Sequence, residues 1–92
     1  MFYLRRVVGE SMLPSARPGQ LVLFWRRRRY KIGDVVLVRH GGLEKIKRIA
    51  KISGDKVFLT GDNPAASTDS RHFGLLPIKQ IAGSALALRK KR

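Results

Sequence analysis

The 92-residue sequence has no cysteine and only two histidines, His40 and His72. Without thiols, the chain cannot form a disulfide, a cysteine nucleophile or a thiolate metal site. Two histidines alone also fall short of the three or four protein ligands that a zinc site usually has. We therefore expect neither a metal site nor a cofactor.

Acidic residues are scarce too: six Asp and Glu stand against 20 Lys and Arg, for a formal net charge of +14. Such an excess predicts attraction to an anionic partner, either nucleic acid or an acidic membrane surface. No segment approaches the roughly 20 apolar residues of a membrane-spanning helix, and residues 1–10 lack the apolar core of a secretory signal. We expect one domain over residues 1–92, cytoplasmic or peripheral to a membrane, without a transmembrane segment.

Apolar residues mostly recur with a period of two, and turn-forming residues come at short intervals, which is typical of β-strands. Gly54 and Asp55 predict a tight hairpin, because glycine tolerates a positive φ. Residues 63–79 predict a long ordered loop with a helical turn, and such loops are often functional. The pattern indicates an all-β domain, either a small coiled sheet or a barrel. The expected strands cover residues 3–8, 20–25, 34–40, 43–52, 56–60 and 80–88.

Ser11 follows the first expected strand, near Gly9 and on a turn closed by Pro14. A nucleophile needs such a rigid, exposed place beside a free backbone N–H, although most serines in turns only shape the turn. Ser11 would also need a base, and His40 and His72 are weak candidates. A lysine held neutral is the other solution. On a strand over residues 43–52, Lys45, Lys47 and Lys51 share one face, and spacing alone does not choose among them.

Four blocks of sequence together resemble the type I signal peptidase family of Ser-Lys endopeptidases, and they occur in the order in which that family has them. Each block alone is weak, but the set spans nearly the whole chain. The blocks are Gly-Glu-Ser-Met-Leu-Pro at 9–14 with Arg-Pro-Gly at 17–19, Tyr-Lys-Ile-Gly-Asp-Val-Val at 30–36, Ile-Lys-Arg-Ile at 46–49 with Gly-Asp-Lys-Val at 54–57, and Gly-Asp-Asn-Pro-Ala-Ala-Ser-Thr-Asp-Ser-Arg-His-Phe-Gly at 61–74.

The resemblance implies a role for each matching residue of the reaction centre. Ser11 matches the nucleophile, and Lys47 matches the general base. Ser67 matches the serine that orients the lysine amine. The backbone N–H of Ser11 would be one oxyanion donor. Some relatives have a second donor from a serine two positions before the nucleophile, but Gly9 stands there in this sequence.

The resemblance also implies supporting residues and a fold. Asp69 and Arg71 match an ion pair that holds the loop against the catalytic strand, and Met12 matches a residue beside the nucleophile and the substrate pocket. The implied fold is a coiled all-β domain of the signal peptidase and LexA-like type. Positive neighbours favour the neutral form of a lysine, so we expect Lys45, Arg48 and Lys51, together with burial, to lower the pKa of Lys47.

Two subtypes of the type I signal peptidase family are compatible with the sequence. Signal peptidases usually carry membrane anchors and often a second β-domain, whereas this sequence resembles the minimal, anchor-free maturation proteases associated with nickel-type superoxide dismutase. That subtype would remove an N-terminal leader in the cytoplasm. The alternative is a generic signal peptidase, which prefers small residues just before the cut and two before that. Self-cleaving LexA-like repressors are disfavoured, because only ten residues precede Ser11.

A four-arginine run supports a rival function. Aromatic residues flank it, with Phe24 and Trp25 before it and Tyr30 after it, which suits a nucleic-acid-binding β-module without catalysis, although nucleic acid is the less favoured partner. A solvated loop and an anionic membrane surface are the other readings. The residues concerned are Phe24, Trp25, Arg26, Arg27, Arg28 and Arg29. The protein partner that the resemblance implies is a precursor with a leader or signal peptide.

Overall fold

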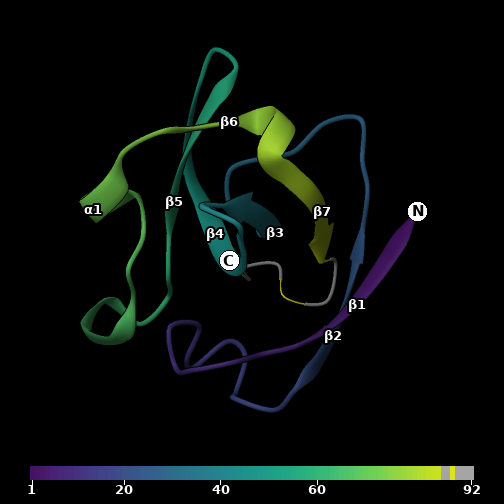
Figure 1. Cartoon of the computed structure of the whole chain (residues 1–92), viewed down its shortest axis with the longest axis vertical. Coiled ribbons are helices and arrows are strands. Elements are labelled where there is room, and N and C mark those ends of the chain that lie inside the picture. The colour runs from purple at the N-terminus through teal and green to yellow at the C-terminus, as the bar shows by residue number, and fades with distance from the viewer. Residues whose placement is uncertain (86–87, 89–92) are drawn as a thin grey trace.

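The computed structural model describes residues 1–85 and residue 88. The described chain forms one antiparallel sheet of seven strands in the order β1-β2-β7-β3-β4-β5-β6 (Figure 1). This confirms the all-β prediction, and the six expected strands are found within a few residues of their expected ends. The strands are β1 (Phe2–Arg6), β2 (Leu21–Trp25), β3 (Val35–His40), β4 (Leu43–Ser53), β5 (Lys56–Thr60), β6 (Leu76–Pro77) and β7 (Ile81–Ala85). Of the strand expected over 80–88, residues 86–87 lie outside the described residues.

The loop over residues 63–79 is built from short pieces. It contains the 3₁₀ turn η1 (Pro64–Ala66), the one-turn helix α1 (Ser70–Phe73), strand β6 and the start of the 3₁₀ turn η2 (Ile78–Gln80). Strand β6 was missed in the sequence because two residues show no periodicity. The side chain of Asp69 accepts from the backbone N–H of Arg71 and so caps α1.

The sheet coils around β3, which is buried on both of its faces. Val35 and Leu37 point into one apolar cluster, which also contains Met12 and Phe24. Val36 and Val38 point into a second cluster with residues of β4 and β5. A strand that is apolar at every position is expected when both faces are covered, and this burial explains the Val-Val-Leu-Val run.

Strand β4 is the longest strand, and its two halves have different partners. Residues 43–48 pair with β3, while residues 48–53 pair with β5 through the hairpin at Gly54, whose φ is +60°. In the described chain, no strand pairs with the other edge of residues 43–47. In Figure 1, β4 and β5 lie on one side of the molecule and β1 and β2 on the other. The open edge of β4 is therefore available to border a groove.

No helix of the described residues is long and apolar enough to cross a bilayer.

Candidate active site

Ser11 lies on the turn that follows β1, and this turn is held at two points by the loop after β5. The backbone N–H of Asn63 donates to the carbonyl of Ser11 at 2.8 Å, and the Asn63 side-chain amide donates to the carbonyl of Glu10 at 3.1 Å. The Ser11 side chain is half-buried. A residue so placed has a defined backbone and a side chain that a second molecule can reach.

A cavity of about 420 Å³, which we call the groove, brings Ser11 and Lys47 together. Residues 5–8 form one wall, residues 44–47 of β4 form the other, and Met12 and Leu37 contribute apolar surface. The groove thus collects a hydroxyl and an amine that are far apart in the sequence. Part of this lining is strand: Arg5 and Arg6 belong to β1, and residues 44–47 belong to β4.

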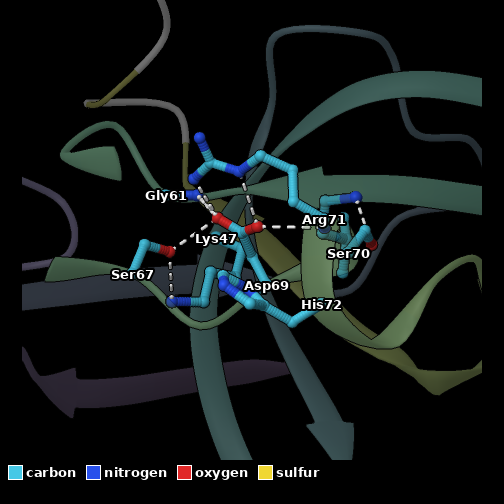
Figure 2. A network of polar contacts seen from close by, with 8 residues as sticks. Lys47, Gly61, Ser67, Asp69, Ser70, Arg71 and His72 are labelled. Carbon is cyan, nitrogen blue, oxygen red and sulfur yellow. Dashed lines mark hydrogen bonds and ion pairs between the residues drawn. The ribbon is translucent and has the colours of Figure 1, made fainter. Parts of the chain in front are cut away.

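Lys47 is 5% exposed and points toward the loop that carries Ser67 and Asp69 (Figure 2). Its Nζ donates to the Oγ of Ser67 at 3.1 Å, and the Ser67 hydroxyl donates to Oδ2 of Asp69 at 2.6 Å. A buried amine without a partner would be costly. The relay from Lys47 through Ser67 to Asp69 therefore fixes the direction of the amine.

Burial lowers the pKa of Lys47 from its ordinary value. Asp69 opposes this shift, and the positive charges of Lys45 and Arg71 add to it. Burial thus acts in the direction expected from the sequence. The cationic neighbours differ from the expected set, because Lys51 is exposed further along β4 and the guanidinium of Arg48 pairs with Asp62.

Asp69 is fully buried, and burial by itself would raise the pKa of its carboxyl group. Hydrogen bonds from Arg71, Ser67 and the backbone N–H of Gly61 outweigh burial and hold this pKa well below its ordinary value. Arg71 reaches both oxygens of the carboxylate, at 2.9 Å from Nε and 2.6 Å from Nη2 (Figure 2). The structure thus brings Asp69 and Arg71 together as an ion pair.

Gly61 leaves no room for a side chain at the point where three segments meet. A Cβ atom there would lie 2.8 Å from the carbonyl oxygen of Ser11 and closer still to the side chain of Ser67. Its φ is not in the left-handed region, so the reason for glycine is space. Sequence reasoning included Gly61 in a motif without a role, because this contact joins residues distant along the chain.

The Asp69–Arg71 pair lies within the loop, and a different ion pair, between Arg48 and Asp62, connects the loop to β4. Arg48 donates to both oxygens of Asp62, each at 2.8 Å, and to the carbonyl of Gly33 at 2.6 Å. The hydroxyl of Ser15 also donates to Asp62. Residues 47 and 48 of one strand therefore position the Ser67–Asp69 segment and the Ser11 turn. The role of Arg48 was missed, although an adjacent Lys-Arg pair and a Gly-Asp pair were visible signals.

Arg5 of β1 and Glu44 of β4 both line the groove and form an ion pair with each other. Nε of Arg5 lies 2.6 Å from Oε1 of Glu44, and Nη2 lies 3.1 Å from Oε2. Hydrogen bonding to Arg5 lowers the pKa of Glu44. Strands β1 and β4 are not neighbours in the sheet, so this pair ties together two walls that backbone hydrogen bonds do not join.

Among the remaining candidate residues, Met12 lines the groove, whereas Gly9, His40 and His72 do not. Met12 is buried and lines it, while Gly9 has a φ of +77° on the exposed turn before Ser11. Nδ1 of His72 accepts from the backbone N–H of Asp69 at 3.4 Å, and His40 stacks on Phe73. Neither histidine lines the groove.

For one residue of the predicted membrane surface, Phe24, the prediction is wrong. Phe24 is fully buried in the core, so it cannot contribute to any surface. Trp25 points outward and is 40% exposed, and Arg26 to Arg29 are exposed. All five residues of β2 are apolar, and the sequence therefore carried no sign of which alternate residues face inward.

The geometry agrees with two comparisons with known proteins. The Peptidase S24-like family matches residues 1–74. The "Mitochondrial ATP-independent inner membrane protease subunit 1a" of Arabidopsis thaliana is 36% identical over 110 residues, a match that covers 87% of this chain. The chain spans 66% of that relative, just under two thirds of its length.

The chain therefore belongs to the Peptidase S24-like family. The resemblance to the type I signal peptidase family is confirmed at this level.

Proposed function

We propose that the protein is a serine endopeptidase in which Ser11 is the nucleophile and Lys47 is the general base. The observation that carries this proposal is that both residues line one groove while Lys47 is buried and oriented by Ser67. A general base must be neutral at the operating pH, and burial of an amine favours the neutral form. The serine-lysine pair is a known alternative to the serine-histidine pair.

The reaction would proceed in two halves. The Ser11 hydroxyl gives its proton to Lys47 while Oγ bonds to the scissile carbonyl carbon, and the resulting oxyanion accepts from the Ser11 backbone N–H. The C–N bond then breaks, the leaving amine takes the proton from Lys47, and an acyl-enzyme remains. A water molecule then gives a proton to Lys47 while its oxygen bonds to the ester carbon. The bond from that carbon to Ser11 Oγ breaks, Oγ takes the proton from Lys47, and the released carboxylic acid loses its remaining proton to solvent.

The proposed substrate is a precursor protein that loses an N-terminal leader or signal segment. Strand residues of β1 and β4 line the groove together with the apolar side chains of Met12 and Leu37, a lining that an extended peptide segment could contact. The type I signal peptidase resemblance supports the same substrate class. Leader maturation, as in the nickel-type superoxide dismutase subtype, and cleavage of a secretory signal are both forms of this proposal.

The experiment is to digest a proteome-derived peptide library and map the new N-termini by mass spectrometry. Ser11→Ala and Lys47→Ala should each lower cleavage by roughly 10⁴-fold, since members of such a unit act together. Ser53→Ala and Lys51→Ala are matched controls, because both residues are exposed outside the groove. Full cleavage by well-folded Ser11→Ala protein would refute the assignment.

The nucleic-acid-binding module is the second candidate. Its support is the exposed arginine run at residues 26–29, whereas membership of a peptidase family favours catalysis. A nucleic-acid binder would lose a strongly salt-dependent affinity for single-stranded DNA or RNA when these arginines are replaced. We expect no such affinity beyond that of a generally cationic protein.

A further inference from the structure

Side chains of β1, β3 and β4 form a polar cluster beside the groove. Arg5 of β1 donates to both carboxylate oxygens of Glu44, at 2.6 Å and 3.1 Å. Arg39 of β3 lies opposite Glu44 in the register of β3 and β4, but its Nε is 3.6 Å from Oε2 of Glu44. The ring centroid of Tyr3 lies 5.5 Å from Cζ of Arg5 and 5.6 Å from Cζ of Arg39. We call these four residues the Arg39 cluster.

Arg39 is the member of the cluster whose hydrogen-bond donors are least used. Arg5 already holds both oxygens of Glu44, and the 3.6 Å contact of Arg39 is longer than a hydrogen bond. In the part of the chain that the structure describes, the Arg39 guanidinium donates no hydrogen bond, and its side chain is 54% exposed. The Tyr3 ring supports the guanidinium at cation–π distance without using its N–H groups. Arg39 therefore offers a planar set of donors that matches a carboxylate.

Arg39 lies on the side of the sheet that faces the groove. Side chains of a strand alternate between its two faces, so Arg39 shares a face with Leu37, which lines the groove. Its cross-strand partner Glu44 lines the groove too. Glu44 comes three residues before Lys47, which places the cluster about 10 Å along β4 from the proposed base. An extended peptide rises equally fast, so the cluster would meet a side chain about three residues from the bond that is cut.

The lining of the groove carries more positive than negative charge. Among its described residues, Arg5, Arg6 and Lys45 are cationic besides the proposed base, and Glu44 is the acidic one. A concave site lined by one sign of charge focuses the potential and attracts ligands of the opposite sign. The surplus therefore favours a peptide with a carboxylate at this place and disfavours a peptide with Lys or Arg there.

We propose that Arg39, supported by Tyr3 and Arg5, is a specificity-determining residue that binds a carboxylate of the peptide substrate. An Asp or Glu side chain about three residues from the cut supplies this carboxylate, or the end of a peptide chain does. The inference rests on the proposed function, because it names the substrate class of the same groove. A generally cationic protein would attract acidic peptides wherever the acidic residue stands, so the position of that residue is the test.

The probes are short peptides of alanine and serine with both ends blocked, in which a single Glu is moved along the sequence. Matched peptides carry Gln or Lys at the same place. At one position, kcat/KM of the full chain should be about threefold to tenfold higher for Glu than for Gln, the range expected for a charged hydrogen bond at a partly exposed site. Lys should give the lowest value there. Gln peptides with a free carboxyl end show whether the carboxylate comes from a chain end or from a side chain.

Two variants of Arg39 test whether the preference is local. Arg39→Gln should bring the ratio of kcat/KM for the Glu and Gln peptides close to one, and Arg39→Glu should make the Lys peptide the preferred substrate. Arg17→Gln is the control, because it removes the same charge from an exposed residue that does not line the groove. Circular dichroism establishes that each variant is folded, and Arg39→Gln alone decides the test if Arg39→Glu does not fold.

Binding of the same peptides to Ser11→Ala protein, measured by calorimetry, separates this inference from the proposed function. Tighter binding of Glu at one position, without cleavage of these peptides or of the library by the wild type, would support the carboxylate site and refute the peptidase. Cleavage with equal kcat/KM for Glu and Gln at every position, and for free and blocked ends, would overturn the inference and leave the peptidase standing.

Two further results would overturn the inference by reducing the effect to net charge. The first is a preference for Glu that is the same at every position of the peptide. The second is a loss of the preference in Arg17→Gln as large as the loss in Arg39→Gln.

Discussion

The Nζ atom of Lys47 lies 3.1 Å from the Oγ atom of Ser67, and the two residues are 20 positions apart in the chain. Ser67 uses its own proton to reach Asp69, so its oxygen is left to accept from the amine. The amine of Lys47 is therefore held by a hydrogen bond to an uncharged hydroxyl group. A carboxylate in direct contact would instead favour the charged form of Lys47, which cannot act as a base.

Ser67→Ala should therefore slow catalysis without removing the base. We expect kcat to fall roughly tenfold to a hundredfold with little change in KM. The free energy of unfolding should fall by about 1 kcal/mol, because Asp69 also loses a hydrogen-bond donor. Steady-state kinetics and chemical denaturation measure the two effects. An unchanged kcat alongside reduced stability would leave Ser67 a purely structural role.

The rate should rise with pH as Lys47 loses its proton, and the rise should occur below the pH at which an ordinary lysine titrates. Lys45→Met removes a positive charge that lowers the pKa of Lys47, so the rising limb should move to higher pH. Lys51→Met is the control, because Lys51 is exposed on the same strand. The shift is measured from profiles of kcat/KM against pH for wild type and the two variants. Equal shifts in both variants would contradict a specific effect of Lys45 on Lys47.

Gly61→Ala should damage the site more than the fold. The added methyl group meets Ser67 and the carbonyl of Ser11, and overpacking of this kind costs about 1–3 kcal/mol. We expect kcat/KM to fall at least roughly tenfold, because displacements on the order of 1 Å can cost 100-fold in rate. Gly42→Ala, at a φ of +78° in open space, should lose stability while cleavage is retained.

Acid should destabilise the protein through Asp69. Its pKa is lowered in the folded state, so the unfolded chain binds the proton more readily. The carboxylate therefore contributes fully above the unfolded pKa of about 3.9, and this contribution is lost as pH falls below that value.

Asp69→Asn should remove this part of the acid dependence and destabilise the protein by about 2–4 kcal/mol at neutral pH. Asp55→Asn, in the exposed hairpin turn, is the control. Denaturation from pH 3 to pH 7, a range that brackets the unfolded pKa, measures both. Parallel pH curves for wild type and Asp69→Asn would rule out this origin of the acid effect.

The Arg5–Glu44 pair should control how far a peptide extends along the groove. Glu44→Gln weakens the tie between the two walls, so KM for long peptides should change while KM for short ones stays constant. The pair is partly exposed, so water screens it and its effect on stability should be small. The exchange of the two residues, Arg5→Glu with Glu44→Arg, should restore the wild-type length dependence. Failure of the exchange, together with normal folding, would argue against a tie.

Local chemistry explains why much of the fold was predictable. Alternation in β4 and β5 and the turn at Gly54 depend on neighbouring residues, so the strands were located within a few positions. Strand β6 was missed, because two residues have no period. The motif containing Ser11 and the one containing Lys47 were visible because each is contiguous in the chain.

What the sequence alone determined was an all-β domain, a strongly basic surface and a set of candidate residues for a peptidase. Only the tertiary structure decided which of them meet. The tight fit at Gly61, the Arg48–Asp62 anchor, the tie between Arg5 and Glu44 and the burial of Phe24 all depend on how the sheet coils. The reason is physical: these contacts join segments distant in the chain, and their energies depend on distance and burial, which local patterns do not record.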